Sequence, residues 1–266
     1  MKLRNEEDPM ITVSSLRNPD RAPARRAGRV AASIDVEWTK NYTVKNGNKP
    51  FCISVVYAPL PRRSTDLSTV AWEYTSVYLE PGEPETALAA RADVLLSAVL
   101  DRADLVTGHQ VCSDFGVLAA TADTGRCAGV DAARLAWRER RSPEQRRRVI
   151  DTRYDAGHIL SGTSRRLVDV ATELGLDVTQ PELGTKSMTA LHKMWLERGS
   201  VEARERISVL NLRHSLSTAL VAFRADGLGT WSGRTLNVNR LIAERAAGAW
   251  AWLDSPTFRS LLQETP

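Results

Sequence analysis

Two carboxylates stand one residue apart near the end of a strongly apolar segment. Asp35 and Glu37 lie in the run RVAASIDVEW (29–38), whose Val, Ile and Trp content predicts a strand. Side chains at positions i and i+2 of a strand share one face, so the two acids point the same way. Carboxylates beside a core strand are costly unless a cation joins them. The pair is therefore either a metal site or a strand end with two solvated acids, and the tripeptide alone leaves both interpretations open.

A third acid follows another predicted strand. The segment 104–108 reads as a short strand that stops at Gly-His, and Ser113 is placed to cap a helix that runs to about residue 122. Asp114 falls in the first turn of this helix, where a negative charge is favoured by the helix macrodipole. Stabilisation of the helix is one explanation for an acid at position 114. The other is that Asp114 lies opposite Asp35 and Glu37 and shares a site with them.

The string GHQVCSDFGVL (108–118) resembles the second exonuclease motif of the DEDD superfamily, in which a strand, Gly-His and a short turn bring an Asp-Phe pair opposite a DxE strand. Here the DxE strand is the first of three predicted strands, and the Gly-His string follows some seventy residues later. The segment Val149 to Thr152 similarly resembles the strand, commonly ending in Asp-Thr, that precedes the last helices of that superfamily. The resemblance extends from about residue 29 to residue 226.

This resemblance implies an α/β fold of the RNase H-like kind, with a five-stranded mixed sheet flanked by helices and, here, a C-terminal helical extension. It implies a 3′-to-5′ exonuclease that hydrolyses phosphodiester bonds from a single-stranded 3′ end of DNA or RNA. Two divalent ions, Mg²⁺ or Mn²⁺, would be held by Asp35, Glu37 and Asp114. The chain does not distinguish DNA from RNA, and the oligomeric state is open.

The sequence departs from the superfamily at its fourth acid. Members carry a late-helix Asp preceded by Tyr (Y-x3-D) or by His (H-x4-D), whereas the helix at 209–220 contains no acid. In one register Leu210 and His214 replace the Tyr and the Asp, and in the other His214 is the histidine and Ala219 replaces the Asp. Both registers place His214 at the site, as a metal ligand or general base. The alternatives are a buried structural histidine, and a chain that is a catalytically weak or inactive nucleic-acid-binding or partner-binding module.

Other residues have more local interpretations. His109 is expected to orient the Gly-His turn and Asp151 to cap the next helix, while His158 and His192 have no partner that the sequence identifies. The segment 134–148 carries seven arginines against two glutamates, which suits phosphate contacts or a solvated loop equally. Trp38 either stacks on a terminal base or packs at the strand end.

The chain is expected to form three parts: a basic disordered arm (1–28), the RNase H-like exonuclease domain (29–228), and a C-terminal helical extension (229–266). Strands are predicted within 29–38, 51–60, 70–79, 104–108 and 148–152. Helices are predicted at 84–101, 113–122, 165–174, 187–197, 202–225, 237–253 and 256–263.

Composition places few limits on function. The net charge of +4 and the isoelectric point near 9.1 suit a polyanionic partner. No apolar run is long enough for a membrane span or a signal peptide, so a cytoplasmic protein is expected. Three cysteines, Cys52, Cys112 and Cys127, lie far apart without a zinc-binding spacing and are expected to be reduced thiols.

Overall fold

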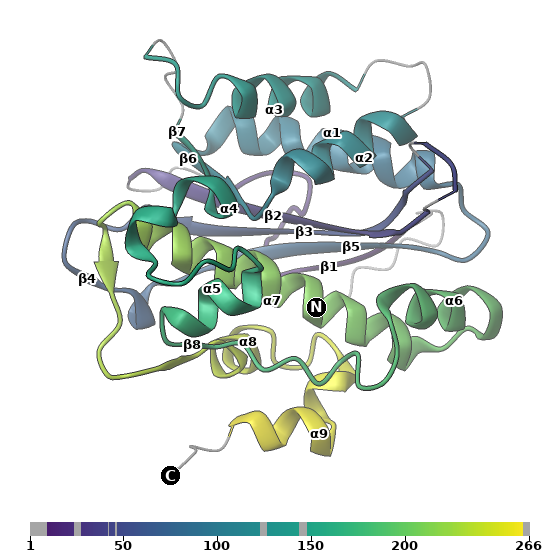
Figure 1. Cartoon of the computed structure of the whole chain (residues 1–266). Helices are drawn as coiled ribbons and strands as arrows, with labels where there is room; N and C mark the ends of the chain where they lie inside the picture. Colours follow the sequence, from purple (N-terminus) through teal and green to yellow (C-terminus); the bar gives the residue numbers. More distant parts are fainter. Residues whose placement is uncertain are drawn as a thin grey trace.

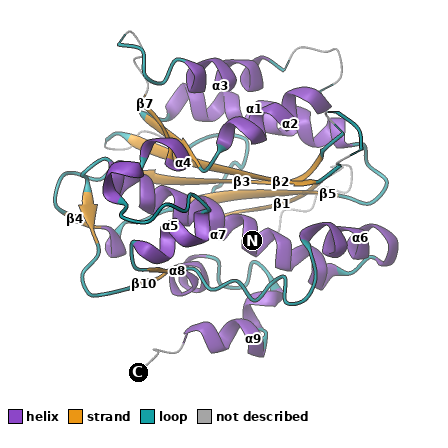
Figure 2. Ribbon diagram, viewed as in Figure 1, coloured by secondary structure: helices purple, strands orange, loops and turns teal. Residues whose placement is uncertain are grey.

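The computed structural model of this α/β protein describes residues 10–23, 28–41, 43–45, 47–122, 127–143 and 148–262. Its centre is a mixed sheet of six strands in the order β1-β5-β3-β2-β6-β7 (Figures 1 and 2). The strands are β1 (Met10–Ser14), β2 (Val30–Thr39), β3 (Lys49–Pro59), β5 (Glu73–Leu79), β6 (Leu105–Gly108) and β7 (Arg148–Asp151). The three long strands and the two short ones that were predicted are all present.

The strand pairing changes from antiparallel to parallel at β2. The pairs β1–β5, β5–β3 and β3–β2 are antiparallel, as expected for a meander, while β2–β6 and β6–β7 are parallel. Parallel strands need a crossover connection, and α1 (Glu85–Arg102) supplies it before β6, as α2 (Val111–Thr121) and α3 (Ala128–Arg138) do before β7. Because β6 pairs with β2 only from Ala31 to Ser33, the second half of β2 is open on that side.

The sheet has a helical layer on each face (Figure 1). Helices α1, α2 and α3 cover one face, where Ile34 and Val36 of β2 join a hydrophobic cluster with Leu95 and Phe115. The long helix α7 (Val201–Ala225) covers the other face and is buried along almost its whole length. Alternate β2 residues therefore face opposite layers, and Asp35 and Glu37 fall on the α7 side.

Further elements surround α7. They are α4 (Thr152–Asp155), α5 (Leu167–Glu173), α6 (Met188–Arg198), α8 (Val238–Arg245), α9 (Pro256–Arg259) and the 3-10 turns η1 (Leu67–Thr69), η2 (Gly157–Ile159), η3 (Ala251–Asp254) and η4 (Ser260–Leu262). Two small parallel pairs join β4 (Thr65–Asp66) to β9 (Gly229–Thr230), and β8 (Leu176–Asp177) to β10 (Leu236–Asn237). Instead of one helix over 237–253, the chain forms α8 and then η3.

The C-terminal extension shares the core of the sheet domain. Trp250, Trp252 and Phe258 are buried in one cluster with residues of α7 and with Tyr74 of β5. Glu205 of α7 accepts a hydrogen bond from the backbone N–H of Trp252 at 3.0 Å. The extension therefore packs on α7 through β9, α8 and η3. Within the described ranges, no helix has both the length and the apolar composition required to cross a membrane.

The prediction of a disordered arm over residues 1–28 is wrong for Met10–Ser14. These residues form β1, which pairs in register with β5 from Met10 opposite Leu79 to Ser14 opposite Thr75. The sheet therefore has six strands rather than five. Leu16 and Ala22 continue the contact by packing on the cluster beneath α1. Residues 1–9 and 24–27 lie outside the described part of the chain. β1 was missed because a five-residue strand between polar segments carries almost no periodic signal.

Candidate metal centre

Strand β2 presents two acids to helix α7, as the sequence predicts. Asp35 pairs across the sheet with Ser54 and Glu37 with Cys52, and the register shifts directly after Glu37. This bulge ends the regular pairing at the point where the site begins. Glu37 is buried and the Asp35 side chain is about 14% exposed, so both carboxylates sit in a poorly solvated environment.

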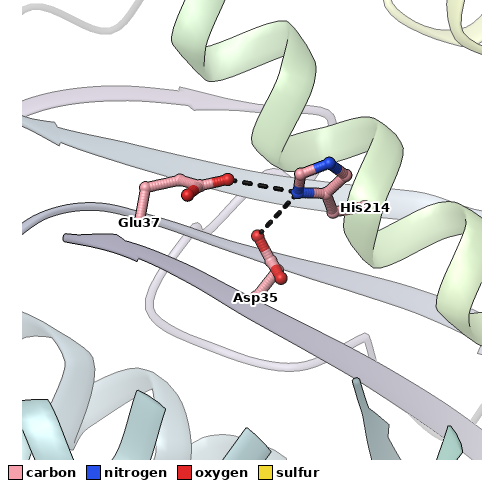
Figure 3. A group of neighbouring side chains, drawn as sticks. All are labelled: Asp35, Glu37 and His214. Carbon is pink, nitrogen blue, oxygen red and sulfur yellow. Dashed lines mark hydrogen bonds and ion pairs between the residues drawn. The ribbon is translucent and has the colours of Figure 1, made fainter. Parts of the chain in front are cut away.

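Helix α7 brings His214 to both acids (Figure 3). Its Nδ1 lies 3.2 Å from Glu37 Oε1 and 3.5 Å from Asp35 Oδ2. The three residues each offer one ligand atom, and these atoms lie within 4.8 Å of one another. The prediction that His214 reaches the DxE pair is therefore confirmed as geometry. Whether His214 binds a metal or is a structural histidine that is hydrogen-bonded to the acids stays a prediction.

Asn211, one turn before His214, also contacts the acid pair. Its Nδ2 donates to Asp35 Oδ2 at 2.6 Å, and its carbonyl accepts from Ser54 Oγ at 3.0 Å. Ser215 joins the same contact, with its Oγ 2.6 Å from Ser54 Oγ. These bonds between α7 and β3 set the rotation of the helix that points Asn211 and His214 at β2. Sequence analysis missed Asn211, although its i−3 spacing from His214 puts the two on one helical face.

The carboxylates and the imidazole strongly affect each other's protonation. Burial opposes a charge on His214, but hydrogen bonds from the imidazole to Asp35 and Glu37, together with their negative charges, outweigh it and raise its pKa to about 10. Burial and the neighbouring charge of Asp35 raise the pKa of Glu37, while His214 opposes that rise. Without a metal, the imidazolium compensates one of the two carboxylate charges. A divalent ion and the imidazole proton would compete for the same carboxylates.

Asp114 occupies the open side of β2. It is 3% exposed, and its carboxylate accepts a hydrogen bond from the backbone N–H of Val36, the residue between the two acids. Burial, followed by the charges of Asp35 and Glu37, raises its pKa well above the usual range. Asp114 therefore lies within electrostatic reach of the pair. It is not one of the three residues whose ligand atoms fall within 4.8 Å, and its sharing of a metal with them stays a prediction.

A buried carboxylate fixes the turn that positions Asp114. Gln110, at the start of α2, has a left-handed backbone with φ of 59°, and its N–H donates to Asp151 Oδ1 at 2.8 Å. Asp151 also accepts from the N–H of Arg153 at 3.1 Å and from Trp137 Nε1 at 2.9 Å. The predicted capping role of Asp151 is confirmed. Its hold on Gln110 was missed, because the two residues are 41 positions apart.

His109 holds the neighbouring turn, as expected. Its Nδ1 lies 2.9 Å from Thr152 Oγ1 and its Nε2 2.9 Å from the carbonyl of Arg165. Burial lowers the pKa of His109 to about 4, so the ring is neutral at physiological pH. With both nitrogens engaged, His109 connects the end of β6 to α4 and to the segment before α5.

The far side of His214 meets a buried, charged loop. Gln180 Nε2 lies 3.1 Å from His214 Nε2. Two residues on, Glu182 forms a bidentate ion pair with Arg213, and both side chains are fully buried. When the Gln180 amide donates to Nε2, the imidazole proton stays on Nδ1, facing the acids. When its oxygen accepts from Nε2–H instead, Nδ1 is free to bind a cation. Gln180 therefore influences which tautomer faces β2.

The two remaining histidines are structural. His192 stacks on Phe51 with ring centroids 4.0 Å apart, and its Nδ1 lies 3.0 Å from Tyr78 Oη. Burial lowers its pKa to about 4. His158 Nε2 lies 2.9 Å from the carbonyl of Ala225. These partners come from distant elements, which is why the sequence identified none.

The arginine-rich segment is mostly engaged in ion pairs where the structure describes it. Arg140 and Arg141 both pair with Asp155, at 3.0 and 2.8 Å, and Arg148 pairs with Asp226. Arg140 also lies over the Trp137 ring, 4.2 Å from its centroid. Residues 144–147 lie outside the described part. These contacts favour a structural role for much of the segment over the phosphate grip that was considered.

Sequence comparison assigns no relative to this chain. No model of a known protein family matches it, and no curated protein matches it either. The geometry and chemistry of the site are therefore what indicate a function. Two carboxylates and an imidazole with converging ligand atoms are a donor set that suits a divalent ion such as Mn²⁺, and their low exposure gives such an ion little competition from water.

Proposed function

We propose that this chain is a metal-dependent 3′-to-5′ exonuclease of the DEDD type with an RNase H-like fold. The observation that carries the proposal is the contact of His214 with Asp35 and Glu37, on the face of β2 that looks toward α7. The superfamily resemblance expects the last acid at this position on the late helix. In this chain His214, 177 positions after Glu37, contacts the same carboxylates. This contact fits the replacement of the fourth acid by histidine that the sequence suggests.

The sheet supports the fold part of the proposal. An antiparallel meander of β2, β3 and β5, followed by parallel β6 and β7 on the other side of β2, is a five-stranded mixed sheet with helical crossovers. β1 is an addition at the edge of β5. The carboxyl ends of parallel strands are where α/β proteins bind ligands, and Asp114 follows β6 at that end.

Each residue then has a role in hydrolysis. Divalent ions, when bound, supply an activated water and stabilise charge on the attacking and leaving oxygens. Asp35, Glu37 and Asp114 would hold these ions. His214 would either complete the ligand set or act as a general base, with Nδ1 taking the proton from the attacking water. Asn211 fixes the orientation of Asp35 through its 2.6 Å bond. When a bound ion displaces the Nδ1 proton and the ring is neutral, Gln180 at Nε2 would influence which nitrogen of His214 carries the remaining proton.

A hollow on the α2 side of the sheet, lined by sequence neighbours of Glu37 and Asp114 but not by the acids themselves, offers a place for the substrate. It encloses about 860 Å³ between the β2–β3 connection and α2, and Trp38 and Ser113, the neighbours of Glu37 and Asp114, line it. Lys45 and Arg134 contribute positive charge to its wall. An aromatic ring beside basic groups suits a single strand, since bases stack on the ring and phosphates pair with the cations. We place the 3′-terminal nucleotides here.

The test uses single-stranded DNA and RNA labelled at either end, with the metal-free chain supplied with Mg²⁺ or Mn²⁺. A 5′ label should appear in a ladder of shortening products, and a 3′ label in mononucleotides from the start. Asp35→Asn should reduce the rate by about a hundredfold or more. Activity that Asp35→Asn leaves intact, or degradation that starts at the 5′ end, would refute the proposal.

Substitutions at His214 test the altered ligand set. Because Mg²⁺ prefers oxygen and Mn²⁺ tolerates nitrogen, His214→Asp should raise activity with Mg²⁺ relative to Mn²⁺, and His214→Ala should impair both. His158→Ala is the matched control. His158 lies on η2, and within the described chain its side chain forms one hydrogen bond, with the carbonyl of Ala225. Full activity of His214→Ala would make His214 a packing residue.

One observation favours the second candidate, a member of the fold that binds nucleic acid or a protein without cleaving. His214 and Asn211 already form hydrogen bonds with the acid pair, so its carboxylates have partners without a metal. On this alternative, the chain retains oligonucleotides in a filter-binding assay but cleaves none with either ion. Mn²⁺ binding distinguishes the two candidates. If the wild type binds Mn²⁺ and Asp35→Asn does not, the result favours the enzyme.

A further inference from the structure

A second hollow lies at the other end of β2, away from the acids. It encloses about 750 Å³, within the ~300–1,000 Å³ usual for small-molecule sites. Val30 lines it, and Asp35 is five residues further along the strand, roughly 17 Å away at about 3.3 Å per residue. The hollow is therefore separate from the candidate metal centre. Its described lining comes from 16–18, 21–23, 28–30, 57–59 and 71–73, together with Arg245 of α8. We call it the arginine pocket.

The wall of this pocket is strongly basic. Four arginines line it, Arg17, Arg21, Arg29 and Arg245, against one acid, Glu73. Arg245 lies 3.5 Å from Glu73, and Arg29 lies 3.8 Å from Asp104, so these two are partly compensated. Arg17 and Arg21 have no ion-pair partner among the described residues.

The nearest acid in the chain does not neutralise Arg17 and Arg21. Asp20 stands between them in sequence, but its carboxylate is engaged by Arg91 of α1. Two exposed guanidinium groups that line one pocket, without an ion pair among the described residues, suit a doubly charged oxyanion, since each presents a fork of donors that matches phosphate.

The remaining wall is apolar and aromatic. Trp72, Tyr57 and Ala58 line it, and the first two are 6% and 1% exposed. The Tyr57 hydroxyl is buried and has no hydrogen-bond partner within the part of the chain that the structure describes. A buried hydroxyl without a partner is uncommon and costs stability unless something binds it. Tyr57 therefore gives a second indication of a ligand, independent of the arginines.

We propose that the arginine pocket binds a nucleoside phosphate, with the base against Trp72, the phosphate at Arg17 and Arg21, and the Tyr57 hydroxyl as a hydrogen-bonding group on the pocket lining. A planar aromatic group joined to a dianion is the chemistry that an aromatic, apolar wall beside two free guanidinium groups recognises. A free mononucleotide and the 5′-phosphorylated end of a nucleic-acid strand both have this chemistry. The proposal does not depend on the exonuclease activity, because the pocket lies apart from Asp35 and Glu37.

Isothermal titration calorimetry on the full chain in EDTA tests this, since chelation removes any metal-mediated binding at the acids. AMP should bind saturably, while adenosine, ribose 5-phosphate and inorganic phosphate should each bind at least about tenfold more weakly. Arg17→Ala combined with Arg21→Ala should weaken AMP binding by roughly a hundredfold, because each removes a charge-assisted contact worth about tenfold. Arg198→Ala is the matched control, an exposed arginine on α6.

Two further arms separate the sources and the sites. A 5′-phosphorylated single strand that binds more tightly than its 5′-hydroxyl counterpart identifies a strand end, and AMP binding without that difference identifies a free nucleotide. Asp35→Asn should leave AMP binding unchanged whether or not it abolishes nuclease activity. The proposal is overturned if AMP does not bind, if phosphate alone binds equally well, or if the double arginine variant binds AMP like Arg198→Ala.

Discussion

The ion pair between Glu182 and Arg213 should be among the most sensitive contacts in the chain. Both side chains are fully buried, and the guanidinium binds both carboxylate oxygens while its Nε donates to Asn239 Oδ1 at 2.7 Å. Removing one partner leaves an uncompensated charge in the interior, which costs about 3–5 kcal/mol. Glu182→Leu and Arg213→Met should therefore each lower the free energy of unfolding by about that amount.

Replacing both partners together should cost less than either single change. The double variant buries no unpaired charge, and its main penalty is the Asn239 amide that loses a donor, about 1–3 kcal/mol. Urea denaturation of the four proteins gives the coupling energy of the cycle. Because a fall of 1 kcal/mol shifts the melting temperature by roughly 2–4 °C in a chain of this size, each single variant should melt well below the wild type.

An exposed pair provides the control for this cycle. Arg259 and Asp254 lie 2.8 Å apart, but their side chains are 64% and 66% exposed. Asp254→Ala should leave stability almost unchanged, because solvent screens such pairs. If Glu182→Leu and Arg213→Met cost no more than the exposed control, or if their effects simply add, the buried pair does not anchor the loop.

Three further predictions concern other parts of the fold. Deleting residues 1–14 removes β1 and exposes the edge of β5, so calorimetry should show a lower melting temperature and light scattering more association; a deletion without either effect would show that β1 is not needed. His192 has a folded pKa of about 4 against 6.5 when unfolded, so its contribution is present above pH 6.5 and is lost as pH falls towards 4, by up to about 3 kcal/mol. Between pH 6.5 and 4, the urea midpoint of His192→Phe should fall less than that of the wild type. If both proteins show the same pH dependence, the lowered pKa of His192 is contradicted. Asp151→Ala leaves the N–H of Gln110 without its acceptor and should cost roughly 3 kcal/mol in unfolding free energy, whereas Asp155→Ala, at a more exposed carboxylate, should cost less.

Much of the fold follows from local pattern in the sequence. The β-branched and aromatic content of β2 and β3 and the apolar spacing of α1 are properties of each segment alone, so these elements could be predicted without knowing their neighbours. The alternation of side chains along a strand likewise placed Asp35 and Glu37 on one face. His214 was identified because both registers of the motif reach it, and the structure brings it to those two acids.

Tertiary structure decided the contacts that join distant segments. Met10–Ser14 become a strand only because β5 offers an unpaired edge some 65 residues away. Asn211, Gln180 and the Glu182–Arg213 pair carry no local signature, since a polar residue in a helix or loop has the same sequence whether it is solvated or buried. Their roles depend on how α7 rotates against β2 and β3. That rotation is set by bonds such as the one between Ser54 and Ser215, which connect residues 161 positions apart and exist only once the sheet and the helix are packed together.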